Sequence, residues 1–228
     1  MDPDLAETDQ PYAYAGDDPV NEGDPTGLDQ SINLKGVANW ARTNGPEAWK
    51  DGYNDDCTDF VSRALSEGGD AAFNYGPDWP FDHTDPHYWF PAHDIFGIHV
   101  PASYSWAESE DLYEYLQINR SPLVGGPIHL GPSGGCPNQD GPYKLPSGIQ
   151  QGDVIFANFE SSASAGIQHA GIVVGVEAGN LTIAQHSENV VETLSDWQYL
   201  GAHHGEPGSD TYVWIVQPQQ LPTGALIA

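Results

Sequence analysis

The order of helical and strand patterns along the chain is the feature that most constrains its fold. Apolar residues recur at helical spacing over residues 32–41 and 56–69. Ser105-Trp106-Ala107-Glu108 has the pattern of a capping box that opens a helix extending to about Gln117. The last third instead contains short β-branched segments bounded by turn residues, namely Asp153–Phe159, His169–Val176, Leu181–His186 and Tyr212–Gln217. Helices followed by an antiparallel sheet predict an α+β fold.

Two segments between these patterns read as loop-like insertions, at about 70–104 and 121–148. The first is rich in Pro, Asp, His and aromatic residues, and the second contains Gly125-Gly126-Pro127. Both compositions disfavour long regular elements. A tight hairpin turn is predicted at Glu177-Ala178-Gly179-Asn180. We expect one folded domain over residues 31–228, a size that supports a substantial core.

The charge is strongly one-sided, with 33 Asp and Glu against 6 Lys and Arg, a formal net charge of −27. Residues 1–30 are rich in carboxylates and contain no Lys or Arg, so we expect an acidic, flexible N-terminal arm. Nucleic-acid binding and adhesion to anionic membranes both need basic residues and are excluded as functions. No apolar run is long enough for membrane insertion.

Cys57 lies where a helix would make a thiol reactive. Asp56 is a suitable N-cap and Gly68-Gly69 a suitable stop, so Cys57 falls in the first turn of the predicted helix. The positive end of the helix dipole lowers a thiol pKa there. His169 opens an apolar strand and is a candidate base on a rigid element. His186 ends the next strand and is a candidate for the third group that orients His169.

Four segments resemble one protein family. Asn54-Asp55-Asp56-Cys57-Thr58-Asp59-Phe60-Val61-Ser62 resembles the DCTNFVSQ-type nucleophile motif of the putative amidase domain family, related to NlpC-type and CHAP-type papain-like cysteine peptidases. Its later strands are similar to Gly152-Asp153-Val154-Ile155-Phe156, Gln168-His169-Ala170-Gly171-Ile172-Val173 and Ala184-Gln185-His186-Ser187. Ser103-Tyr104-Ser105-Trp106 is similar to a helix start between these motifs. The resemblance spans roughly residues 32–217.

The resemblance implies a papain-like α+β fold, with a nucleophile-bearing helix packed on an antiparallel sheet. It implies hydrolysis of an amide through a thioester, with Cys57 attacking, His169 shuttling the proton and His186 orienting His169. Tyr53 and Asp56 would position the substrate or its oxyanion. The substrates implied are peptides, especially peptidoglycan, with an extracellular or cell-wall location expected and a cytoplasmic one as the alternative. No cofactor and a monomeric state are expected.

Several positions leave alternatives open. Trp79, Trp89 and Trp106 are candidates for a substrate wall, or they belong to an aromatic mini-core. Gln185 or Glu188 could take the place of His186. Asp59 stands where relatives carry Asn or Gly, and its charge opposes thiolate formation.

Interpretations of the cysteines and histidines without a catalytic role also stay open. Cys57 could be a buried core residue or form a disulfide with Cys136. The acidic loop from Asp51 to Asp56 offers oxygens to calcium without EF-hand spacing. No metal site is predicted from the cluster of His83, His87 and His93, because it lacks a His-Glu-x-x-His pattern.

Three rival functions share these residues: a transglutaminase or other acyltransferase, a secreted effector toxin, and a catalytically silent binding domain. The net charge of −27 bears on the substrate. So acidic a protein is repelled by anionic wall polymers unless salt screens them. The charge fits a high-salt habitat or a cationic peptide substrate.

Overall fold

The computed structural model describes residues 31–47, 56–76, 82–132, 143–159, 164, 166–177, 179–186, 190–198, 210–219, 221 and 223. The predicted N-terminal arm lies outside these ranges. Helices and an antiparallel sheet confirm the α+β class. None of the helices in the described part of the chain is long and apolar enough to cross a membrane.

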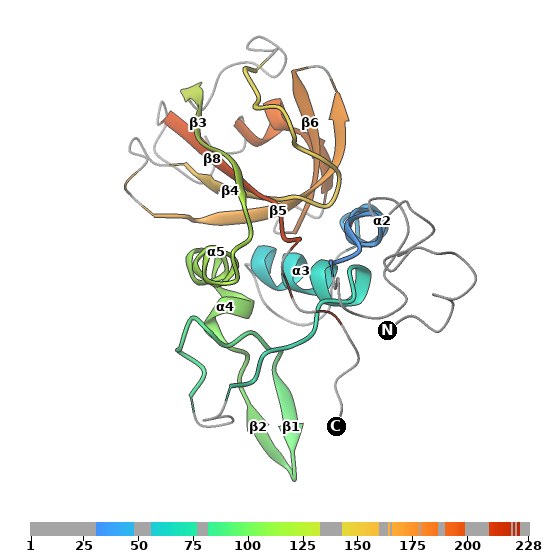
Figure 1. The fold of residues 1–228 in the computed structure, drawn as a ribbon, viewed down its shortest axis with the longest axis vertical. Coiled ribbons are helices and arrows are strands. Elements are labelled where there is room, and N and C mark those ends of the chain that lie inside the picture. Colours follow the sequence, from blue (N-terminus) through green and yellow to red (C-terminus); the bar gives the residue numbers. More distant parts are fainter. Residues whose placement is uncertain are drawn as a thin grey trace, which may run out of the picture.

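The centre of the molecule is a six-stranded antiparallel sheet of order β3-β8-β4-β5-β6-β7 (Figure 1). Its four inner strands match the four predicted segments and are β8 (Asp210–Val216), β4 (Val154–Asn158), β5 (His169–Glu177) and β6 (Asn180–Gln185). Glu177 and Asn180 are register partners, which confirms the predicted hairpin. The edge strands are β3 (Leu123–Pro132) and β7 (Val190–Thr193).

Residues 194–198 are helical and contribute Leu194 and Trp197 to a core on one face of the sheet. The other helices form a layer against the opposite face (Figure 1). They are α2 (Leu34–Asn44), α3 (Cys57–Arg63) with its π-helical continuation η2 (Ala64–Gly68), α4 (Tyr104–Ala107) and α5 (Ser109–Ile118). A small hairpin of β1 (His93–Ile95) and β2 (Ile98–Val100) extends away from the sheet beyond this layer (Figure 1).

Both faces of the inner strands are buried, and alternate residues serve two different cores. On β4, Val154 and Phe156 pack against the helices, whereas Ile155 and Ala157 pack into a second core on the opposite face. Trp197 and the partly buried loop residues of 143–149 cover that second core. Strand side chains alternate between the two faces of the sheet, so whether the residue number is odd or even decides which core an inner-strand residue enters.

The predicted insertion at 121–148 is wrong over its first part, because residues 123–132 form β3. The glycines and prolines that disfavour a central strand are tolerated at a sheet edge, where one side of the ladder needs no partner. The pairing of β3 with β8 is accordingly interrupted by register shifts after Leu123, Gly125 and His129.

The single helix predicted from the capping box is also wrong. Ser105 lies inside α4, and Glu108 adopts an extended conformation (φ −112°, ψ 132°) that separates α4 from α5. The chain therefore restarts a helix at Ser109, and this break brings the first turn of α5 beside the first turn of α3. The predicted stop at Gly68-Gly69 is confirmed, since η2 ends at Gly68.

Glycine is required where α2 crosses η2. A Cβ atom added to Gly36 would lie 2.0 Å from the carbonyl oxygen of Gly68, and one added to Gly68 would lie 2.7 Å from Cβ of Trp40. The two backbones approach too closely for any side chain between them. This crossing fixes α2 against the helix that carries Cys57.

Asp153, at the start of β4, is a buried carboxyl with an unpartnered oxygen. Its side chain is fully buried, and Oδ1 has no hydrogen-bond partner. Oδ2 accepts a hydrogen bond from the backbone N–H of Gln150, 2.9 Å away. Burial raises the pKa of Asp153 to about 7, although hydrogen bonds from Gln150 and Gln217 act in the opposite direction.

Replacing Asp153 by Asn should stabilise the protein at alkaline pH. The folded-state pKa of about 7 lies above the unfolded value of about 3.9, so the folded state retains a proton that the unfolded state has lost. Wild-type stability therefore falls as pH rises through this window, by up to about 4 kcal/mol. Urea unfolding at pH 4 to 9 should show an advantage of Asp153→Asn that grows up to about pH 7 and is constant above it. The exposed Asp70→Asn is the control, and an advantage that does not change with pH would contradict the assignment.

Candidate active site

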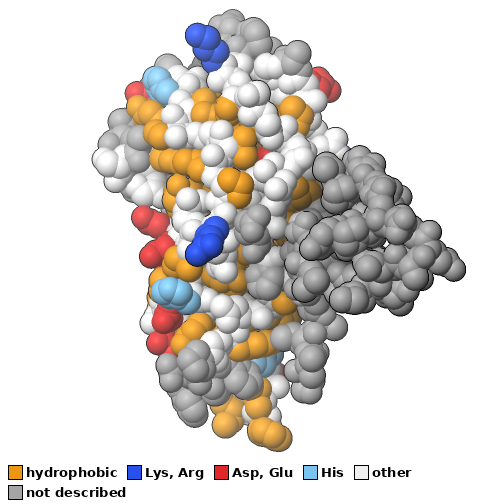
Figure 2. Space-filling view, in the orientation of Figure 1, with side chains coloured by type: hydrophobic (Ala, Val, Ile, Leu, Met, Phe, Trp, Pro, Cys, Tyr) orange, Lys and Arg blue, Asp and Glu red, His pale blue; other side chains and the backbone are white. Residues whose placement is uncertain are grey.

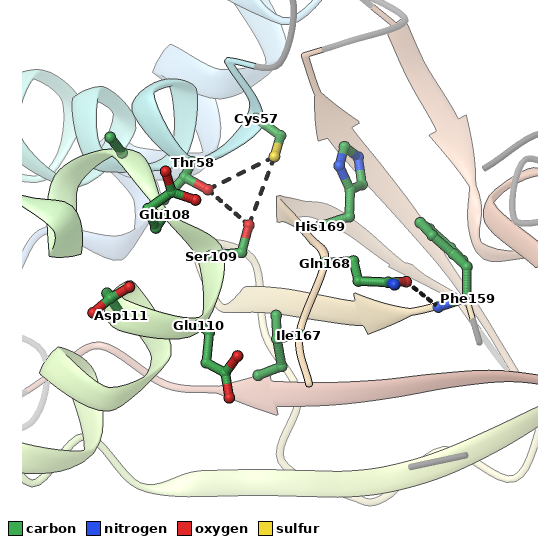
Figure 3. A pocket seen from close by; sticks show the side chains of 11 residues that line it. Cys57, Thr58, Glu108, Ser109, Glu110, Asp111, Phe159, Ile167, Gln168 and His169 are labelled. Carbon is green, nitrogen blue, oxygen red and sulfur yellow. Dashed lines mark hydrogen bonds between the residues drawn. The ribbon is translucent and has the colours of Figure 1, made fainter. Parts of the chain in front are cut away.

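Cys57 and His169 face each other at the junction of the helical layer and the sheet (Figure 3). Cys57 is the first residue of α3 and His169 the first residue of β5. Both side chains are buried, with 6% and 9% of their surface exposed. Cys57 is a free thiol in this structure. The predicted pairing of these two residues across the fold is therefore present in the structure.

The two groups shift each other's pKa. Burial alone would raise the pKa of the Cys57 thiol, but the charge of His169 and hydrogen bonds with His169, Thr58 and Ala170 lower it to about 7. Burial likewise disfavours the imidazolium, but the thiolate and hydrogen bonds with Cys57 and Gln185 raise the pKa of His169. A thiolate–imidazolium pair is thus favoured near neutral pH, which is the form in which a thiol is nucleophilic.

The far side of the imidazole is held by an amide and a carboxylate. His169 Nε2 donates a hydrogen bond to Gln185 Oε1, and Gln185 Nε2 donates to Glu192 Oε1 on β7. The carboxylate only accepts, so it fixes which end of the amide faces His169. With Nε2 engaged by Gln185, Nδ1 is the ring nitrogen left to exchange a proton with the thiol.

The structure corrects the assignment of His186 as the group that orients His169. Ala170 and Ile172 of β5, like Ala184 of β6, pack into the core under the helices. By alternation, His169 and Gln185 project to the other face, and the Ile172–Ala184 register makes them diagonal neighbours. His186 has the wrong parity. Gln185, the alternative from the sequence, takes this role, and the odd–even alternation of strand residues is the sequence signal that selects it.

His186 instead connects the sheet to the start of α3. Its Nδ1 donates to Asp56 Oδ2 over 2.8 Å, and its Nε2 lies 3.2 Å from the carbonyl oxygen of Asn44. Its ring stacks on Phe60 with centroids 4.4 Å apart. Asp56 occupies the N-cap position but makes no side-chain cap hydrogen bond, because its carboxylate is directed to His186. The two residues fix the backbone immediately before Cys57.

Two hydroxyls lie against the thiol. Cys57 Sγ is 3.7 Å from both Thr58 Oγ1 and Ser109 Oγ, which are 2.7 Å from each other (Figure 3). Ser109 is the first residue of α5, so it reaches the site through the helix break at Glu108. The sequence pattern did not identify Ser109, since a continuous helix from Ser105 gave it no special place.

The charge of Asp59, expected to oppose thiolate formation, has partners of opposite polarity. Arg63 Nε is 2.9 Å from Asp59 Oδ2, and Trp106 Nε1 donates to Asp59 Oδ1. This pairing of Asp59 weakens its effect on the thiol.

The thiol opens into a cavity of about 530 Å³. The cavity lies between α3, the start of α5 and the segment that leads into β5 (Figure 3). Its lining residues are Cys57, Thr58, Ala107, Glu108, Ser109, Glu110, Asp111, Phe159, Ile167, Gln168 and His169. The dimensions suit a small peptide segment or an amide of similar size.

Trp89 and Trp106, two of the three tryptophans considered for a substrate wall, belong to the core instead. Trp89 is fully buried and donates through Nε1 to Ser62 Oγ at 3.0 Å. Trp106 packs on Trp89 with ring centroids 5.0 Å apart, is 2% exposed, and lines a smaller cavity of about 200 Å³. Tyr88 and Phe90 form a satellite cluster with Val100, which agrees with the mini-core alternative.

Some sequence assignments fall outside the described residues, namely Tyr53, Trp79, Cys136, Glu188 and the acidic loop before Asp56. Within the described part of the chain, no three His, Cys, Asp or Glu side chains gather as a metal site. His87 instead pairs with Asp85 at 2.7 Å, and His99 with Asp94 at 3.1 Å.

The fold and the site together define an α+β protein with a buried cysteine–histidine pair at the base of a cavity. The chain belongs to the putative amidase domain family, whose model matches residues 36–214. This confirms the family resemblance, and membership suggests amide hydrolysis generally. Comparison with curated proteins and with solved structures found no match.

Alkylation of Cys57 should report its lowered pKa. Iodoacetamide reacts with the thiolate, so the rate should rise with a midpoint near pH 7. His169→Ala removes the group whose charge opposes the effect of burial, so its midpoint should move above about 8.5. Peptide mapping by mass spectrometry separates Cys57 from Cys136. A wild-type midpoint near 8.5 would contradict the ion-pair assignment.

Gln185 and His186 should have separable effects. Gln185→Ala frees His169 to adopt another orientation and should raise the Cys57 midpoint with little loss of stability. His186→Ala leaves Asp56 without its partner and should lower the free energy of unfolding by about 2 kcal/mol or more, with the midpoint close to wild type. Thiol titration and urea unfolding measure the two effects. A midpoint raised equally in both variants would return the orienting role to His186.

Proposed function

We propose that the protein hydrolyses an amide bond through a thioester on Cys57. The observation that carries this proposal is the contact of Cys57, at the first turn of α3, with His169 in a cavity of about 530 Å³. Membership of an amidase family and the lowered pKa of the thiol support the same chemistry.

The first half of the reaction forms the thioester. The Cys57 thiolate attacks the amide carbonyl, and the oxyanion is assigned to the backbone N–H of Cys57, because the first N–H groups of a helix have no intrahelical acceptor. The His169 imidazolium then gives its Nδ1 proton to the amide nitrogen. The carbon–nitrogen bond breaks, the amine leaves, and the acyl group remains on sulfur.

The second half releases the acid. Neutral His169 takes a proton from a water molecule, which attacks the thioester carbonyl and expels the thiolate. His169 is left protonated, so the starting pair is restored. Gln185, held by Glu192, keeps Nδ1 directed at the reacting atoms through both steps. Gln185 is thus a positioning residue.

The proposed substrate is a peptide, with peptidoglycan stems and cross-bridges as the specific case, which would require action outside the cytoplasm. The size of the cavity and its position at the surface support a peptide segment. The peptidoglycan assignment is carried by the family resemblance and is the part of the proposal that most needs a direct experiment.

Digestion of purified peptidoglycan and of a mixed peptide library should release new amine and carboxylate termini with the wild type. Cys57→Ala and His169→Ala should each lower turnover by at least about 10³-fold while retaining the fold, because nucleophile and base act as a unit. Mass spectrometry names the bond cleaved. An added primary amine that captures the acyl group in preference to water would reassign the protein as an acyltransferase.

Cys57→Ser is the matched control for the shape of the site, since it keeps the size of the side chain but replaces the thiol by a hydroxyl of much higher pKa. Its turnover should be as low as that of Cys57→Ala. Termini that appear at equal rates with the wild type and with Cys57→Ala would overturn the proposed function. Cleavage of library peptides but not of peptidoglycan would retain the cysteine chemistry and exclude the wall as substrate.

A further inference from the structure

Three carboxylates line the cavity that contains the thiol. Glu108 separates α4 from α5, and Glu110 and Asp111 lie in the first turn of α5 (Figure 3). None of the described lining residues is Lys or Arg. Acidic side chains are also visible along the edge of the molecule at the level of α5 (Figure 2). Apart from His169, the charged side chains among the described lining residues are all carboxylates.

Glu110 and Asp111 lie in the first turn of α5, where acidic side chains interact favourably with the helix dipole, so part of their role is structural. Glu108 occupies the N-cap position of α5 without a side-chain cap hydrogen bond. Within the described part of the chain, no Lys, Arg or His forms an ion pair with Glu108, Glu110 or Asp111. Burial, and then the charges of Glu114 and Glu110, raise the pKa of Asp111, although a hydrogen bond with its own backbone N–H acts in the opposite direction.

The wall opposite these carboxylates includes two apolar side chains beside Gln168 and His169. Phe159 and Ile167 line the same cavity on the side of the sheet. Glu110 reaches across to the segment before Ile167, because a Cβ atom added to Gly166 would lie 3.0 Å from Glu110 Oε2. A ligand with an alkyl stem and a positive end would find an apolar surface for the stem and carboxylates for the charge.

We propose that this cavity selects amide substrates that carry a primary ammonium or guanidinium group close to the scissile bond. The inference rests on the proposed function and adds the chemical class of its substrate, a cationic peptide. Glu110 and Asp111 would bind the charge, and Ile167 and Phe159 the aliphatic stem. A cationic group bound beside these carboxylates gains a Coulomb attraction that a neutral peptide does not.

Charged thiol reagents test this without turnover. Cys57 is treated with methanethiosulfonates that carry an ethyltrimethylammonium or an ethylsulfonate group, and the rate ratio of cation to anion is divided by the same ratio for 2-mercaptoethanol. We expect a normalised ratio well above one. It should fall roughly tenfold in the variant Glu108→Gln, Glu110→Gln, Asp111→Asn, and part of the way in Glu110→Gln alone.

The matched control is Glu177→Gln. Glu177 ends β5, about 26 Å along the strand from His169, which is beyond the screening length of about 8 Å at physiological salt. This variant changes the net charge by the same amount as Glu110→Gln but leaves the cavity unchanged, so its normalised reagent ratio should equal that of the wild type. A fall as large as in Glu110→Gln would mean that the overall charge, not the cavity, sets the preference, and would overturn the inference.

A binding readout completes the test. Acetyl-Ala-Lys-Ala amide should protect Cys57 from iodoacetamide at lower concentration than the matched Gln and Glu tripeptides, and the triple variant should lose this difference. Equal protection by the three peptides, or a normalised reagent ratio near one, overturns the inference and leaves the cysteine chemistry intact. Absence of any labelling at Cys57 in the folded, reduced protein would overturn the proposed function as well.

Discussion

Burial of both faces of the inner strands is the constraint on which the site depends. Since β4, β5 and β8 pack on the helices with one face and on the second core with the other, no inner residue can change sides. This parity sends Gln185 to His169 and His186 to the helical layer. Two adjacent polar residues thereby acquire different tasks, one holding the imidazole and the other holding the start of α3.

The cysteine–histidine pair lies where the helical layer meets the end of the sheet, and its chemistry is a balance of opposed effects. Burial disfavours both the thiolate and the imidazolium, yet their mutual attraction and the hydrogen bonds to both groups together outweigh it and lower the pKa of Cys57 to about 7. Such a balance depends on position, because attraction falls with distance whereas the cost of burial remains. The Asp56–His186 contact and the Phe60 stacking are therefore part of the reactive geometry.

Part of the negative charge of the chain lies in the cavity next to Cys57. Taken alone, the formal net charge of −27 excludes only anionic partners. Glu108, Glu110 and Asp111, which form no ion pair within the described part of the chain, concentrate part of that charge beside the thiol, where it favours a cationic ligand. A positively charged peptide would remove the electrostatic objection that applies to anionic wall polymers. Burial is the main cause of the raised pKa of Asp111, and such a peptide would offset the smaller contributions of Glu114 and Glu110.

The sequence by itself determined the α+β order, the four inner strands, the helix that begins at Cys57 and the pairing of Cys57 with His169. The elements follow from local periodicity, and the pairing of Cys57 with His169 follows from residue chemistry and the family resemblance. Only the tertiary structure decided that residues 123–132 form an edge strand, that the helix breaks at Glu108, and that Ser109 and Gln185 reach the site while Trp89 and Trp106 do not. The reason is that edge pairing, helix breaks and burial depend on which distant segments pack together, and a local pattern does not contain that information.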